Sequence, residues 1–274
     1  VAKVDSIMST QMNKSFEKKK QEALELLPEL KEKLGAKADG VSDQNLLKFL
    51  HWKTDVNRAS ERFLAHLKWR KENAWAFDSN PPMLAHKDEK LKQILESDVI
   101  VAPTGMKDKN GNTILVGRLR NNDMSDGRTA EDVVRMVLYV MDRAMEDEDT
   151  QINGIAIFHD LNGLSVKNLS PTIPRLLFNA LIGHFPIRIQ GAYLLNAPIF
   201  FRGMFSAISL MMPSKLRKRF RFVSSIDEIP IEAEEHLREH GGSRIYNSKE
   251  WMEAQIQREL DECMDSFSGC VAQK

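Results

Sequence analysis

Residues 154–223 constrain the fold of this chain more strongly than any other stretch. Two short apolar runs, residues 154–158 and 187–195, are flanked by Gly, Pro and Asn and are too short to form helices. Both runs are therefore expected to be buried strands. A helical segment with a Ser170-Pro171 start lies between them, and strands that alternate with helices of this length are typical of a largely parallel sheet. The sequence thus predicts an α/β fold.

Neighbouring segments extend the predicted sheet and its covering helices. Residues 99–101 are expected to form an edge strand, and residues 114–116 with Leu119 are expected to form a second strand. A long helix is expected over residues 129–148, where apolar side chains recur at helical spacing, and a last helix over residues 250–262. The sheet is expected to be mixed but largely parallel.

The first part of the chain has a different pattern, which is helical throughout. Residues 13–34 show near-helical apolar spacing, and Pro28 is expected to kink this helix or to divide it in two. Two more helices with polar start signals follow, and Pro81-Pro82 is a plausible boundary. We expect an all-helical N-terminal subdomain over residues 1–82 and an α/β domain over residues 83–274.

Composition and motifs argue against several functional classes. The chain has 39 Lys and Arg against 39 Asp and Glu, so its net charge of zero gives no general attraction to nucleic acid. It contains no glycine-rich phosphate loop and no Gly-x-Ser-x-Gly elbow for a serine nucleophile. The histidines have no metal-ligand spacing, and His159 and His184 are expected to be satisfied structural residues. We therefore expect no enzyme activity, no metal and no cofactor.

The sequence favours a soluble protein of a reducing, cytoplasmic compartment. Cys263 and Cys270 are too few for a disulfide framework in a chain of this length. No apolar run approaches the roughly 18 residues of a membrane span, and the N-terminal residues lack the apolar centre of a signal peptide.

Residues 199–212 form a helical pattern with almost no polar face. One apolar stripe consists of Phe201, Met204, Phe205, Ile208, Met211 and Met212, and a second of Phe200, Ala207 and Leu210. A surface helix normally has one apolar stripe and one polar face. The pattern alone leaves two interpretations open, a helix buried on both sides and a helix that covers a cavity and also meets lipid.

A dense run of positive charge follows directly and favours the second interpretation. This basic strip consists of Lys215, Arg217, Lys218, Arg219 and Arg221, and the next acidic residue is Asp227. Such a run is most often a solvated edge, but each Lys or Arg near an anionic membrane contributes about 1 kcal/mol of binding. RNA is a weaker candidate partner because the chain is neutral overall.

Five short motifs stand in a characteristic order along residues 46–246. They are residues 46–50 followed by 68–71, the turn at 160–165, Phe185-Pro186, Asn196-Ala197-Pro198 and Gly241-Gly242. In this order they resemble the CRAL-TRIO family of lipid-transfer proteins. The resemblance implies a lipid-binding domain whose sheet forms the floor of an apolar cavity, closed by a mobile helical gate at about residues 198–212.

The resemblance and the phases of the predicted elements together suggest the residues of the cavity. The gate residues are Ile199, Phe200, Phe201, Met204, Phe205, Ile208 and Met211. The expected lipid contacts are Phe158, Ser165, Leu177, Leu181, Ala192, Leu194, Phe205, Ile208 and Met212, with Ser165 as the polar one.

Positions around the gate also carry an implied membrane role. In a tocopherol-carrying member of the family, basic residues beside the gate bind phosphoinositide headgroups. The matching and neighbouring positions here are Lys53, Arg188, Lys215, Arg217, Arg219 and Arg221, while Gln190 replaces a further basic residue. A phosphatidylinositol-carrying member has a glutamate where this chain has Ile187, which argues against phosphatidylinositol as cargo.

The expected function is the transfer of one hydrophobic lipid, an isoprenoid such as a retinoid or tocopherol, at anionic membranes that contain phosphoinositides. The protein is then expected to be cytoplasmic and peripherally membrane-associated, with no nucleic-acid partner. Two alternatives remain open: a phospholipid exchanger of the same fold, and a module that senses phosphoinositides without carrying cargo.

Overall fold

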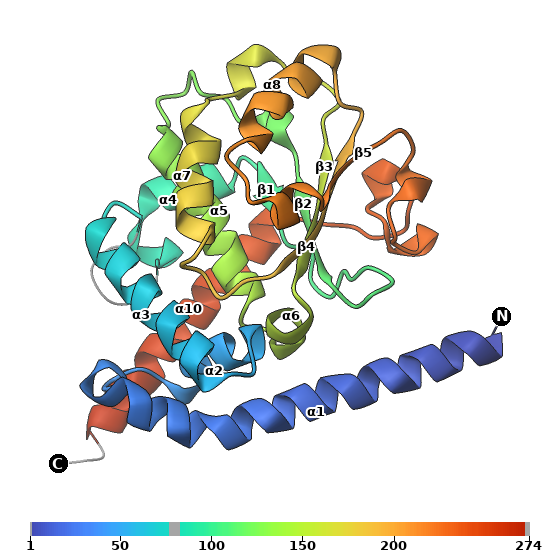
Figure 1. Cartoon of the computed structure of the whole chain (residues 1–274). Helices are drawn as coiled ribbons and strands as arrows, with labels where there is room; N and C mark the ends of the chain where they lie inside the picture. Colours follow the sequence, from blue (N-terminus) through green and yellow to red (C-terminus); the bar gives the residue numbers. More distant parts are fainter. Residues whose placement is uncertain (1, 77–82, 272–274) are drawn as a thin grey trace.

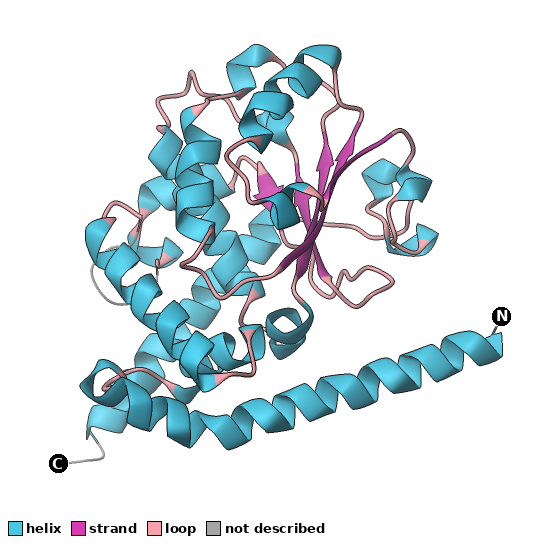
Figure 2. Cartoon of the chain, in the orientation of Figure 1, coloured by secondary structure: helices cyan, strands magenta, loops and turns pink. Residues whose placement is uncertain are grey.

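The computed structural model describes residues 2–76 and 83–271, and it describes side chains for residues 14–76 and 83–261. Within these residues it confirms the predicted α/β class, with one sheet in the order β1-β2-β3-β4-β5 (Figure 2). Strand β1 pairs antiparallel to β2, and the other pairings are parallel. The strands are β1 (Ile100–Val101), β2 (Thr113–Gly117), β3 (Ile155–Asp160), β4 (Ile189–Leu195) and β5 (Phe220–Val223).

Helices cover one face of the sheet and short 3-10 turns cover the other (Figure 1). On the helical face lie α4 (Glu89–Leu95), α5 (Ala130–Ala144), α7 (Thr172–Leu181) and α8 (Ile199–Ser209). Successive residues of β3 point to opposite faces, so Ile157 joins the core under the helices and Phe158 joins the core on the other side. This alternation decides which predicted site residues can share one cavity.

The N-terminal region is helical, as predicted, and has a hydrophobic cluster of its own. Helix α1 (Ala2–Leu34) is continuous through Pro28, so the predicted division into two helices is wrong. Leu27 and Leu30 on either side of the proline are buried against α2 (Asp43–Trp52) and α3 (Val56–Glu72), and this packing stabilises a helix that lacks one backbone hydrogen bond.

The boundary expected at Pro81-Pro82 lies outside the described residues, and the division into two domains remains a prediction.

Three other sequence expectations need correction. Leu119 lies in a 3-10 helix and not in β2. The helix expected over residues 129–148 is divided into α5 and α6 (Glu148–Asn153), because the side chain of Asp147 caps a new helix. The last helix, α10 (Ser248–Val271), is longer than expected, and a buried carboxylate at Glu259 attaches it to α5 by accepting a 2.7 Å hydrogen bond from the Tyr139 hydroxyl.

Candidate functional site

Helix α8 is apolar on both its inner and its outer side. Phe201 of α8 and Met212, which lies three residues after the end of the helix, face inward and are 5% and 3% exposed. Ile199 and Leu210 face outward and are 89% and 74% exposed. The interpretation of a helix buried on both sides is therefore wrong. Large exposed apolar side chains grouped on one helix are typical of a surface that contacts a protein, a ligand or a membrane.

The inner side of α8 rests on the sheet mainly through aromatic rings. Phe201 belongs to one hydrophobic cluster with Leu194 of β4. The ring of Phe205 lies 5.3 Å from the rings of both Phe220 and Phe222 on β5. Because Arg221 between these two phenylalanines is exposed, β5 presents alternate residues to α8 and to solvent.

The start of α8 is connected to the turn that follows β3. Asp160 ends β3, and its carboxylate accepts hydrogen bonds from Arg120 at 3.0 Å and from the backbone N–H of Asn162 at 3.1 Å. Burial raises the pKa of Asp160, but the nearby imidazole of His240 and hydrogen bonds from Asn196, Asn162 and Arg120 outweigh burial and hold the pKa well below its usual range. The carboxylate is therefore a charged anchor beside the segment that leads into α8.

The structure brings together some of the predicted lipid contacts and separates others. Leu194 and Phe205 share the cluster under α8, and Met212 is buried at the end of that segment. Leu177 and Leu181 belong to the larger core beneath α7. Ala192 is buried on the same strand face as Leu194. Ile208 is only partly exposed, as are the gate residues Met204 and Phe205.

Two predicted contacts need correction. Phe158 points to the opposite face of the sheet, where its ring lies 4.8 Å from the ring of His240, so it cannot share a lining with α8. The hydroxyl of Ser165 donates to the side chain of Asn168 at 2.7 Å as part of a capping box, so its proton is already engaged.

The predicted membrane residues divide into an exposed group and a partly buried pair. Lys215 and Arg217 lie on α9 (Ser214–Arg217) and, with Lys53 and Arg221, are exposed. Arg188 donates to the backbone carbonyls of His51, at 2.7 Å, and of Ile152. Arg219 donates to the carbonyl of Ile189.

The partly buried pair has a third member that the sequence did not indicate. Burial and the neighbouring charge of Arg219 lower the pKa of Arg188. Burial and the charge of Arg188 likewise lower the pKa of Lys19 on α1. The charge of Arg188 thus interacts with that of Lys19 and with that of Arg219, and we call these three residues the basic cluster. Lys19 lies in a run of three lysines that resembles an ordinary solvated helix face, so nothing in the sequence marks it.

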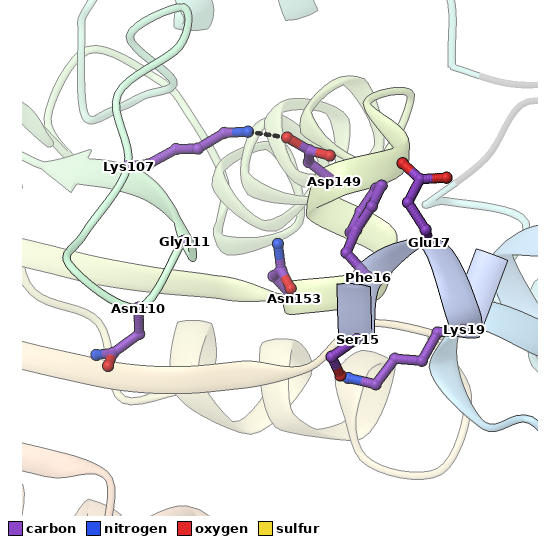
Figure 3. A pocket seen from close by; sticks show the side chains of 9 residues that line it. All are labelled: Ser15, Phe16, Glu17, Lys19, Lys107, Asn110, Gly111, Asp149 and Asn153. Atoms are coloured by element: carbon purple, nitrogen blue, oxygen red, sulfur yellow. Dashed lines mark hydrogen bonds and ion pairs between the residues drawn. The ribbon is translucent and has the colours of Figure 1, made fainter. Parts of the chain in front are cut away.

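Two pockets of the described surface lie away from α8. Figure 3 shows one of about 760 Å³ between α1, the hairpin before β2 and α6, where Lys107 pairs with Asp149. The other, of about 480 Å³, includes Ala102, Trp251 and Arg258 in its lining. Neither is lined by a residue of α8 or by a predicted lipid contact, so neither is the expected lipid cavity.

Among the described helices, none combines the length and the apolar character needed to cross a bilayer.

The domain comparisons decide the family. The family model for the CRAL/TRIO domain matches residues 98–242, which is more than half of the chain. The chain belongs to the CRAL/TRIO domain family. Proteins with this domain bind and transfer small hydrophobic lipids, and they are generally not enzymes.

Relatives within the CRAL/TRIO family match only parts of their own length. Human clavesin-2 is 28% identical over 183 residues, which cover 65% of this chain and 54% of clavesin-2. Mouse alpha-tocopherol transfer protein-like is 33% identical over 90 residues, which cover 32% of this chain and 26% of that protein. Mouse tyrosine-protein phosphatase non-receptor type 9 is 28% identical over 174 residues, 63% of this chain but 28% of the phosphatase. The chain spans about half or less of the length of these relatives, so their whole activities do not transfer to it.

A solved structure supports the fold. The crystal structure of Sfh5 superposes with a TM-score of 0.54 at 14% identity, and the match covers 89% of this chain and 97% of that one. At this identity the likeness concerns the arrangement of helices and sheet alone.

Proposed function

We propose that this chain carries one hydrophobic lipid and exchanges it at an anionic membrane surface, without a catalytic step and without a cofactor. One observation carries the proposal. Exposed apolar residues on α8 and the exposed basic residues that follow the helix lie together on one part of the surface. Ile199, Phe200, Leu210 and Met211 are exposed by 42–89%, and Lys215, Arg217, Lys218 and Arg221 follow within a short stretch of chain.

The energetics of this surface suit reversible membrane contact. Burying a Leu, Ile or Phe side chain fully contributes roughly 1.5–3 kcal/mol, at about 25 cal/mol per Å² of apolar surface. Each exposed Lys or Arg near anionic lipid adds about 1 kcal/mol. These contributions would offset the cost of lifting α8 from the aromatic rings of β5, which exposes the interior to the bilayer for exchange.

The cargo proposed is an isoprenoid such as a retinoid or tocopherol. The cluster under α8 is formed by Leu, Phe and Met side chains, which suit an apolar chain or ring system. At position 187 the chain has a buried isoleucine that belongs to the main core, which leaves no carboxylate there for an inositol ring. A relative whose name refers to alpha-tocopherol transfer supports the same class.

The basic cluster of Lys19, Arg188 and Arg219 is the proposed phosphoinositide site, with Lys53 and Lys215 as further members. Guanidinium groups bind phosphate through two parallel hydrogen bonds, and each carries five N–H donors, of which the backbone carbonyls use only some. The same cluster would also serve a protein that senses phosphoinositides and carries no cargo, which is the second candidate function.

Lipid transfer between vesicles tests the proposal. Donor vesicles of phosphatidylcholine and phosphatidylserine that carry two neutral probes, retinol and α-tocopherol, are mixed with acceptor vesicles that contain phosphatidylinositol bisphosphate. The transferred probe is measured by mass spectrometry. The wild type should accelerate transfer, and Ile199→Ser with Leu210→Ser should slow it by about tenfold, since roughly 1.4 kcal/mol of membrane contact is a factor of ten.

A matched control removes two apolar residues elsewhere. Leu24→Ser with Leu64→Ser changes side chains that are each 42% exposed on the helical N-terminal region. This variant should transfer lipid as the wild type does. Equal loss in both variants, or no transfer by the wild type, would contradict the proposal.

A further inference from the structure

His159 lies on the face of the sheet that α8 covers. Its strand neighbours in the sheet register are Gly117 on β2 and Leu194 on β4. Leu194 belongs to the cluster that includes Phe201 of α8. In contrast, Phe158, the residue before His159 on β3, points to the opposite face. Alternation along β3 therefore directs the imidazole toward the interior beneath α8.

The position of the imidazole depends on a glycine beside it. A Cβ atom placed on Gly117 would lie 1.9 Å from Nδ1 and 2.3 Å from Cε1 of His159. Real side-chain contacts are never this close, so the ring occupies the space that any other residue at position 117 would fill. Here glycine is needed for a close approach and not for an unusual backbone angle.

The imidazole has no hydrogen-bond partner within the described part of the chain. Its Nδ1 is covered and unpaired. Burial lowers the pKa of His159 to about 4, and the residue as a whole is only partly exposed. The expectation of a satisfied structural histidine is therefore wrong for His159, whereas His184 fits it, with Nδ1 2.8 Å from the carbonyl of Asn179 and its ring stacked on Trp69.

An unpaired polar group in the interior has an energetic cost that a ligand can remove. A buried donor or acceptor without a partner costs about 1–3 kcal/mol. A neutral imidazole offers one donor and one acceptor nitrogen, which matches a hydroxyl or a carbonyl oxygen. It offers no charge to balance a carboxylate, a phosphate or an ammonium group in an apolar interior.

We propose that His159 is the polar recognition group for the cargo, and that it selects neutral lipids with a hydroxyl or carbonyl group placed beneath α8. This inference rests on the proposed function, because it needs a lipid in the interior. It narrows that function by stating the chemistry of the polar end of the cargo.

Three retinoids with one hydrocarbon skeleton test the selection. Retinol, retinal and deoxyretinol, in which a methyl group replaces the hydroxymethyl group, differ only at this end of the molecule, and vesicles containing equal amounts of the three are equilibrated with the wild type, with His159→Phe and with His159→Gln. Protein-bound lipid is then extracted and quantified by mass spectrometry. The wild type should hold retinol or retinal at least about tenfold over deoxyretinol, which has no oxygen to pair with the imidazole, as expected from one hydrogen bond of roughly 1.4 kcal/mol.

The two variants separate recognition from folding. His159→Phe should bind lipid but with a preference of about threefold or less, while His159→Gln, which keeps a donor and an acceptor, should retain most of it. Thermal unfolding of each protein checks that both remain folded. If His159→Phe is unfolded, His159→Leu replaces it as the variant without a polar group at this position. The lipid preference is then compared among the wild type, His159→Gln and His159→Leu.

Failure of this inference is distinguishable from failure of the proposed function. A wild type that holds lipid with the same preference as His159→Phe, or that holds a phospholipid instead, overturns the role of His159 and leaves lipid carriage intact. A wild type that extracts no lipid of any kind overturns both.

Discussion

The side chain of Asn196 donates a hydrogen bond to the carboxylate of Asp160 across 3.1 Å. Asn196 has a φ of 55°, in the left-handed region, and it lies three residues before the first residue of α8. The contact thus joins the end of β3 to the segment from which α8 starts. Since α8 is the proposed gate, this pair fixes the position of its N-terminal end.

Removing this contact should destabilise the fold measurably. Asn196→Ala loses the hydrogen bond and places a Cβ-bearing residue with no local polar compensation in the left-handed region, for an expected cost of about 1–3 kcal/mol. Asn196→Gly loses the hydrogen bond but tolerates the backbone angle, so its cost should be smaller. Denaturant unfolding of both variants measures the difference, and equal stability of all three proteins would show that the contact has no energetic role.

Because the imidazole of His159 lies against Gly117, we expect replacement of this glycine by alanine to destabilise the protein. Gly117→Ala should cost about 1–3 kcal/mol, because the new Cβ overlaps the imidazole. Gly203→Ala is the matched control, since Gly203 lies in α8 with open space around it, and alanine there should stabilise the helix by about 0.5–1 kcal/mol.

A double-mutant cycle identifies the cause of the Gly117 effect. Combining Gly117→Ala with His159→Ala should recover part of the lost stability, with a coupling of about 0.5–3 kcal/mol. Strict additivity of the two substitutions would mean that the imidazole and the alanine do not compete for space.

His66 should make the protein less stable in mild acid. Burial, followed by the charge of Arg70, lowers the pKa of His66 to about 3, and its ring packs edge-on against Phe49 and Phe185. Between about pH 6.5 and pH 3 the unfolded chain binds a proton at this residue and the folded chain does not. The free energy of unfolding therefore falls as the pH falls through this window, by up to about 1.4 kcal/mol per pH unit.

Replacing His66 with phenylalanine isolates this effect. His66→Phe keeps an aromatic ring between the two phenylalanines and removes the titration. Denaturant unfolding at about pH 7 and about pH 5 should show a smaller loss of stability in the variant than in the wild type, by roughly 1–2 kcal/mol. An identical loss in both proteins would contradict the assignment.

Charge reversal on the basic strip should weaken membrane binding selectively. Lys215→Glu with Lys218→Glu removes two exposed charges near α8, and at about 1 kcal/mol each the affinity for phosphatidylserine vesicles should fall at least about thirtyfold. Arg219 is a poorer choice, because its guanidinium also holds the carbonyl of Ile189.

The control for this experiment reverses charges far from the strip. Lys37→Glu with Lys71→Glu changes two exposed lysines of the helical N-terminal region and keeps the same net charge as the test variant. Vesicle sedimentation of both variants gives the comparison. Equal binding by the two would mean that only overall charge matters and that the strip has no special role.

The sequence predicted the central strands and α8 well because local signals suffice there. The apolar runs at 154–158 and 187–195 correspond to β3 and β4 within two residues, since Gly and Pro mark their ends. Strand β5 was missed because Arg221 and its basic neighbours mask the alternation of Phe220 and Phe222. Charged residues dominate the composition of this stretch, although it is the side chains of Phe220 and Phe222 that pack against α8.

The site was predicted less well, because it depends on registers and on distant contacts. A shift of one residue changes the face of a strand, which is why Phe158 was placed beneath α8 while its neighbour His159 was dismissed. The relation of His159 to Gly117 spans 42 positions and exists only in the parallel pairing of β2 with β3. Lys19 joins Arg188 across an even longer separation.

Native mass spectrometry of this chain can identify the lipid that it carries. The protein is equilibrated with phosphatidylcholine–phosphatidylserine vesicles that contain retinol and α-tocopherol, separated from them and sprayed under native conditions, and the released lipid is identified by fragmentation. Each chain should release one neutral isoprenoid. Chains that remain free of lipid, or that release a phospholipid in its place, would contradict the proposed function.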